Sequence, residues 1–137
     1  MPLEELAAHY TRRKANIREP SILIRINRLY RYGMTDAELY DATRSAWKVG
    51  QRSREQVELA FAVFEGVIRE VYSVIRWLPG GSTFNGRWSG RATDRGDRWE
   101  FVGTIAPDSV RDRYVNRYVG DRFTQGAQNP IAYVNLK

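Results

Sequence analysis

The sequence predicts an α+β domain whose curved, mostly antiparallel β-sheet closes into a barrel flanked by helices. Two apolar runs, 57–64 and 67–75, are rich in β-branched and aromatic residues, and Glu65-Gly66 between them suits a two-residue hairpin turn. Gly66 supplies the positive φ angle that such a turn needs. With the elements below, the expected order is β-α-β-β-β-α-β, and helices set between runs of strands are typical of this class.

Residues 1–19 carry apolar side chains at helical spacing together with the basic cluster Arg12-Arg13-Lys14. Two interpretations stay open for 1–20: a helix packed on the flank of the domain, or a basic arm that contacts phosphates. Pro20 ends this segment, because the residue before a proline is disfavoured in a helix. We expect a strand at 21–27 with a core face formed by Ile22, Ile24 and Ile26 and a mixed face formed by Leu23, Arg25 and Asn27.

Thr35-Asp36-Ala37-Glu38 has the form of a capping box and predicts a helix from Asp36 to about Ser45. Trp47 then falls in the turn after this helix, and Ser53 to Gln56 repeat the capping pattern before a short helical turn. Glycine and arginine dominate from Leu78 to Arg98, which predicts a long loop. The remaining expected elements are a strand at 99–105, a helix at 107–116 and a last strand at 131–134. No second domain boundary is evident, so 1–137 is expected to form one domain.

The composition excludes several classes of protein. The chain has no cysteine and a single histidine, His9, so thiolate metal sites, histidine clusters and catalytic triads have no support. No apolar run approaches the roughly 20 residues that cross a bilayer, and the N-terminus is acidic where a secretory signal is basic. We therefore expect a cytoplasmic protein without a membrane partner.

We expect no catalytic residue, no metal and no cofactor. Any metal would have to be bound by carboxylates. Each candidate carboxylate has a structural explanation in a helix cap, the hairpin turn or a strand surface: Asp36, Glu38, Glu65, Glu70 and Glu100.

The net charge of +6 is carried almost wholly by arginine, since the only lysines are Lys14, Lys48 and Lys137. Guanidinium groups bind phosphate with two hydrogen bonds and stack on flat rings, which favours nucleic acid as the partner. A GC-rich genome explains the arginine bias equally well. Three of the four tryptophans, Trp47, Trp77 and Trp88, fall at element ends or in loops around the predicted barrel mouth. Base stacking on an indole contributes roughly 1–3 kcal/mol, which offsets the few kcal/mol needed to extrude one base.

Five segments in order resemble the YTH domain, and more loosely the EVE and ASCH modules of the PUA-like superfamily. They are Ile22-Leu23-Ile24-Arg25-Ile26-Asn27, Ser45-Ala46-Trp47-Lys48, the hairpin 59–68, Trp77-Leu78-Pro79-Gly80-Gly81 and Arg98-Trp99-Glu100-Phe101-Val102. The similarity covers about 21–106, whereas the C-terminal helix and strand of 107–137 resemble small prokaryotic relatives. Some of those relatives are fused to modification-dependent restriction enzymes, so the resemblance implies DNA or RNA carrying a modified base, and a restriction or RNA-modification partner protein.

In that family an adenine methylated on N6 lies between two tryptophans. The resemblance implies that Trp47 and Trp77 are the walls of an aromatic cage, with Trp88 or Leu78 as a third wall. It further implies that Asn27 bonds a ring nitrogen and that the Lys48 carbonyl accepts from the methylated amine.

The family's phosphate-binding residue is replaced here by Val102 and Gly103. Phosphate binding is therefore expected at Arg25, Arg87, Arg91, Arg95 and Arg98. The prokaryotic ending leaves modified cytosines as competitors of N6-methyladenine. Two other functions stay open: a small nuclease or RNA-processing enzyme of the same barrel family, and a module that binds a peptide or small molecule.

Overall fold

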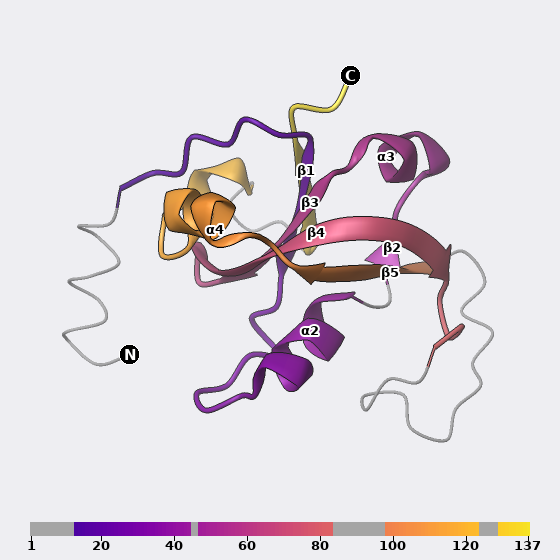
Figure 1. The fold of residues 1–137 in the computed structure, drawn as a ribbon, viewed down its shortest axis with the longest axis horizontal. Helices are drawn as coiled ribbons and strands as arrows, with labels where there is room; N and C mark the ends of the chain where they lie inside the picture. The colour runs from indigo at the N-terminus through magenta and orange to yellow at the C-terminus, as the bar shows by residue number, and fades with distance from the viewer. Residues whose placement is uncertain (1–12, 45–46, 84–97, 124–128) are drawn as a thin grey trace.

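The computed structural model describes residues 13–44, 47–83, 98–123 and 129–137 (Figure 1). Its elements, in chain order, are β1 (Ser21–Arg25), α2 (Asp36–Arg44), β2 (Trp47–Lys48), α3 (Gln51–Gln56), β3 (Leu59–Phe64), β4 (Val67–Pro79), β5 (Arg98–Ile105), α4 (Asp108–Tyr114), the 3-10 helix η2 (Gly120–Arg122) and β6 (Ile131–Val134).

The strands form one six-stranded sheet in the order β2-β5-β4-β3-β1-β6. β1 and β3 are parallel, whereas the pairs β1–β6, β2–β5, β3–β4 and β4–β5 are antiparallel. The sheet curls, with long curved β4 and β5 crossing its middle (Figure 1). The predicted α+β class and mostly antiparallel pairing are confirmed. In the described part of the chain the sheet is a half-barrel with β2 and β6 at its edges.

The β3–β4 hairpin has the predicted two-residue turn. Glu65 and Gly66 have φ angles of 50° and 79°, and positive φ at both central residues is the type I′ geometry that matches strand twist. The side chain of Tyr118 packs over the turn, since a Cβ added to Gly66 would lie 2.7 Å from Tyr118 Cε1. β4 continues to Pro79, beyond the predicted end at 75.

Apolar cores lie on both faces of the sheet. Ile22 and Ile24 belong to one cluster and Leu23 to the other, and all three are fully buried. Leu23 lies on the face predicted to be mixed, but it is fully buried in a cluster that includes Tyr114 of α4. The strand also ends at Arg25, earlier than the predicted Asn27.

The capping box at the start of α2 is confirmed. Thr35 N donates to Glu38 Oε1 and Glu38 N donates to Thr35 Oγ1, each at 3.1 Å. The same pattern at Ser53 does not cap a helix, because α3 begins at Gln51 with Gly50 as its N-cap. α4 and β6 lie where the sequence predicts them, and β5 begins one residue earlier, at Arg98.

The segment 13–19 is not helical. Lys14 forms an isolated parallel bridge with Tyr118, and Ala15 N donates to Tyr118 O at 2.9 Å. Residues 1–12, which carry the rest of the predicted N-terminal helix or arm, lie outside the described residues. The described helices include none with the length and apolar character to span a membrane.

Candidate functional site

Three tryptophans share one face of the sheet at the β2–β5–β4 end. In the strand register Trp47 of β2 lies opposite Trp99 of β5, and Trp77 of β4 lies opposite Phe101 of β5. Alternate residues of a strand point to the same face, so Trp99 and Phe101 lie between Trp47 and Trp77. The Trp77 and Phe101 ring centroids are 5.6 Å apart at an interplanar angle of 69°. The structure thus brings the two predicted cage tryptophans to one surface, with β5 between their strands.

Trp47 is a core residue. It is 9% exposed, and its Nε1 donates to the Thr43 carbonyl at 2.7 Å. It pairs with β5 instead of lying in the predicted turn, because this short strand extends the sheet directly after α2. The indole therefore joins α2 to the sheet and leaves little surface for a ligand.

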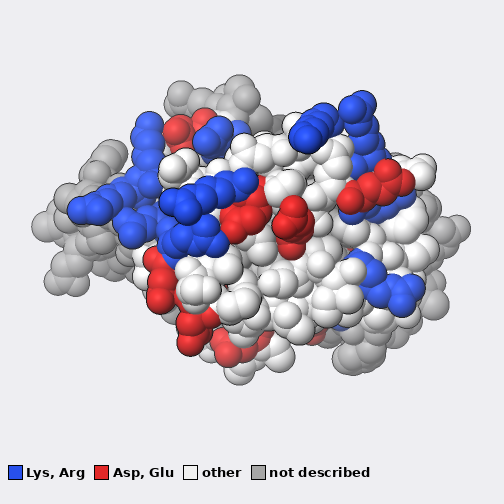
Figure 2. All heavy atoms as spheres, turned by 45° about the horizontal axis from the view of Figure 1, so that its top comes forward, with Lys and Arg blue, Asp and Glu red and all other residues white. Residues whose placement is uncertain are grey.

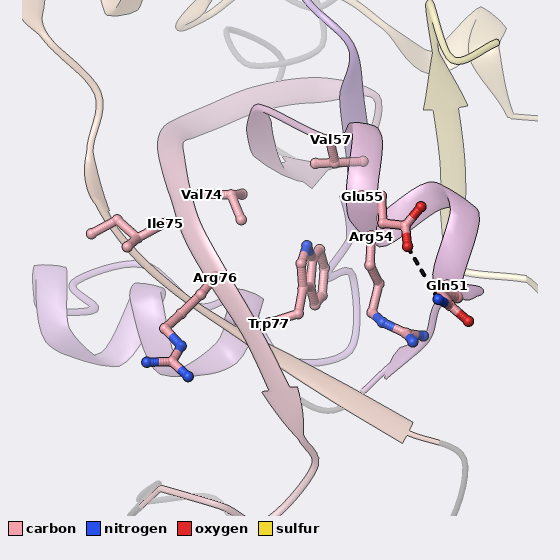
Figure 3. A pocket seen from close by; sticks show the side chains of 8 residues that line it. All are labelled: Gln51, Arg54, Glu55, Val57, Val74, Ile75, Arg76 and Trp77. Atoms are coloured by element: carbon pink, nitrogen blue, oxygen red, sulfur yellow. Dashed lines mark hydrogen bonds between the residues drawn. The ribbon is translucent and has the colours of Figure 1, made fainter.

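Trp77 faces a hollow between β4 and α3. The pocket has a volume of about 410 Å³, within the range usual for small-molecule sites, and its walls are Gln51, Arg54, Glu55, Val57, Val74, Ile75, Arg76 and Trp77 (Figure 3). Trp77 and Arg54 project from opposite sides into this hollow, while Arg76 projects to the other side of β4. Trp77 Nε1 is buried and has no hydrogen-bond acceptor among the described residues. The pocket thus combines an indole wall, an unsatisfied donor and nearby guanidinium groups.

Arg54 is fixed in place by two contacts. Its guanidinium carbon lies 3.6 Å from the centroid of the Trp99 ring, a cation–π arrangement, and its Nη1 donates to the Val49 carbonyl. Across α3, Gln51 Nε2 donates to Glu55 Oε1 at 3.1 Å (Figure 3). Arg54 is not predicted as a site residue from the sequence, because nothing in the local pattern indicates that α3 packs beside Trp99.

Asn27 lies at the hairpin turn. Its Oδ1 accepts a hydrogen bond from Glu65 N at 2.9 Å, which stabilises the β3–β4 turn. This turn begins β4, whereas Trp77 lies near the end of the same strand. The structure therefore does not bring Asn27 to the two tryptophans.

The other predicted site residues are dispersed. Arg25 Nη2 donates to the Asn129 carbonyl at 3.2 Å, and its guanidinium lies 5.1 Å from the Phe123 ring. Lys48 and Arg98 face each other in the β2–β5 register, while Leu78 lies opposite Glu100. By strand alternation these three belong to the face opposite Trp47 and Trp77. Trp88, Arg87, Arg91 and Arg95 lie outside the described residues.

Glu100 and Glu70 are buried, so the prediction that they lie on strand surfaces is wrong. Glu100 is 1% exposed and accepts from Arg44 Nη1 at 2.6 Å, from Gly81 N at 2.8 Å and from Ser82 N at 2.9 Å. Glu70 is 5% exposed and accepts from Arg111 Nε at 2.7 Å. Both carboxylates are buried because tertiary partners satisfy them. Glu100 thereby holds the chain where it leaves β4.

The described residues contain no group of three or more His, Asp or Glu side chains that could hold a metal ion. Comparison with models of known protein families, with curated proteins and with solved structures finds no match to this chain.

Proposed function

We propose that this protein binds nucleic acid and receives a single modified base, N6-methyladenine or a modified cytosine, in the pocket beside Trp77. One observation carries the proposal: the pocket wall is an indole whose N–H has no acceptor among the described residues. A buried donor without a partner costs about 1–3 kcal/mol. A small movement of Trp77 toward a ring nitrogen or carbonyl of a bound base would satisfy that donor.

The neighbouring residues fit such a ligand. Stacking of a base on the Trp77 indole is worth about 1–3 kcal/mol, and burial of its methyl group adds about 0.8 kcal/mol. Arg54 is held against Trp99 at the pocket wall, where its guanidinium would meet the base edge. Arg76 is exposed and projects to the other side of β4, so it could meet only phosphates that flank the base.

This proposal changes the roles of the expected site residues. Trp77 remains a wall, and Arg54 on α3 takes the place of Trp47 beside it. Trp47 supports the wall from the core, since it and Trp77 belong to the same apolar cluster. Asn27 contributes to the hairpin and has no direct role at the base.

The proposal is tested by titrating the protein into fluorescent oligonucleotides that carry one N6-methyladenine, 5-methylcytosine, 5-hydroxymethylcytosine or unmodified base, each as RNA and as DNA. We expect tighter binding to one modified base than to its unmodified parent, and weaker binding as salt rises. Cleavage of the oligonucleotides with divalent metal would instead identify a nuclease. Absence of binding to all of them would overturn the proposal and favour a peptide or small-molecule ligand.

A further inference from the structure

A second basic surface surrounds α4, at the far end of β4 from the Trp77 pocket. Its cations come from the segment ahead of β1 and from 113–122, and we call them the α4 basic face: Arg13, Lys14, Arg18, Arg113, Arg117 and Arg122. Figure 2 shows basic side chains gathered on the side of the molecule where α4 and this segment lie in Figure 1.

The two segments are held together by hydrogen bonds. Tyr118 N donates to the backbone carbonyl of Arg13 at 2.8 Å, and Arg18 N donates to the side-chain hydroxyl of Tyr114 at 3.1 Å. Tyr118 also forms an antiparallel bridge with Val67, the first residue of β4. The cations are therefore carried on an ordered backbone that is continuous with the central sheet.

The charges of this face are only partly neutralised. Lys14 pairs with Asp121 at 3.3 Å and Arg113 pairs with Glu19 at 2.8 Å. Arg13, Arg18 and Arg122 are exposed and have no carboxylate partner among the described residues. A polyanion that binds cations without a carboxylate partner gains favourable Coulomb energy and releases its own counterions.

The residue types favour a nucleic-acid backbone over a membrane surface. Five of the face's cations are arginines, which bind phosphate oxygens through paired hydrogen bonds. Membrane-surface sites combine cations with exposed apolar side chains that enter the lipid. The exposed large apolar residues of the described chain, Tyr32, Ile75, Ile105 and Tyr133, all lie outside the segments that carry this face.

We propose that the α4 basic face binds the phosphate backbone of the same nucleic acid whose modified base enters the Trp77 pocket, an inference that rests on the proposed function. The spacing gives it a length requirement. Val67 at one end of β4 contacts Tyr118, and Trp77 lies ten residues further along. At about 3.3 Å per residue the backbones of Val67 and Trp77 are at most about 33 Å apart, a distance that about ten base pairs of duplex would span.

The test compares two variants with the same loss of charge. Arg13→Gln/Arg18→Gln removes two unpaired cations of the face, and Arg28→Gln/Arg31→Gln removes two cations beside α2. Affinity is measured against salt concentration, with DNA of about 16 and about 4 nucleotides carrying a modified or an unmodified base. We expect the first variant to lower the log–log salt slope on the long DNA by about 1.4–1.8, equally for both bases, while the control matches wild type. Neither variant should change binding of the short DNA.

A first variant that binds the long DNA with the wild-type slope would overturn this inference and leave the pocket proposal intact. Binding to vesicles that contain an anionic phospholipid is measured in parallel. If Arg13→Gln/Arg18→Gln weakens binding to these vesicles but not to the DNA, the inference is likewise overturned. If the wild-type protein binds neither this DNA nor RNA of the same lengths, both the pocket proposal and this inference fail.

Discussion

Arg44 and Glu100 form an ion pair inside the protein, with Arg44 Nη1 2.6 Å from Glu100 Oε2 and side chains that are 6% and 1% exposed. The other oxygen of Glu100 accepts from the backbone N–H groups of Gly81 and Ser82. One carboxylate therefore links α2, β5 and the chain that follows β4.

Replacing this carboxylate should destabilise the fold strongly. We expect Glu100→Gln to lower the free energy of unfolding by about 3 kcal/mol, because buried Arg44 loses its buried partner and keeps only the partly exposed Asp41 as a counter-charge. Urea denaturation measures the loss. Lys14→Gln is the matched control, since the ion pair of Lys14 with Asp121 is 71% and 45% exposed and should contribute little. Equal losses in the two variants would show that the buried pair has no special weight.

The hairpin turn gives a prediction with a built-in control. Gly66 and Gly33 both have a φ of 79°, but a Cβ on Gly66 would collide with Tyr118, whereas nothing lies within 4 Å of one on Gly33. Gly33→Ala should cost about 1–2 kcal/mol through its backbone conformation alone. Gly66→Ala should cost at least about 1 kcal/mol more through overpacking. Thermal or urea unfolding measures both losses. Equal losses of unfolding free energy in the two variants would contradict the prediction.

The stability of the protein should depend on Glu19 at acid pH. Burial alone would raise the pKa of Glu19, but hydrogen bonds from the Tyr114 hydroxyl and from Arg113 lower it below the ordinary 4.5. Because the folded state favours the carboxylate, Glu19 adds stability above about pH 4.5 and loses it as the pH falls further.

Urea midpoints measured at about pH 7 and about pH 3 test this effect. Glu19→Gln should lose less stability than wild type between the two conditions. Tyr114→Phe, which keeps the ring that packs against Phe61, should remove part of the same dependence. A Glu19→Gln variant whose urea midpoint falls as much as that of wild type between the two pH values would contradict the prediction.

Elements defined by adjacent residues could be read from the sequence. The capping box at Thr35 and the Glu65-Gly66 turn depend on contacts within a few residues, so their residue types are enough to predict them. β2 was missed because two residues form a strand only when β5 is beside them. The parallel pairing of β1 with β3 likewise depends on the whole topology.

The site was harder to predict for the same reason. The position of tryptophans at the ends of elements predicts that Trp47 and Trp77 lie on one surface. The strand register agrees with this placement. Whether an indole is buried or faces a pocket depends on α3 and on the hydrogen bond to Thr43. Asn27 has a suitable side chain for a base, but its partner is the backbone of a turn distant in sequence.

The most direct test of the proposed base pocket is the affinity ratio between a modified oligonucleotide and its unmodified parent, for wild type, Trp77→Ala and Trp47→Phe. Burial of one methyl group predicts a ratio of about fourfold or more for wild type. Trp77→Ala should weaken binding of the modified base by about 5-fold to 150-fold and bring the ratio close to one. Trp47→Phe, checked for folding by circular dichroism, should keep the ratio. An affinity ratio of one in wild type would contradict the account. So would a Trp77→Ala variant that keeps the wild-type preference for the modified base.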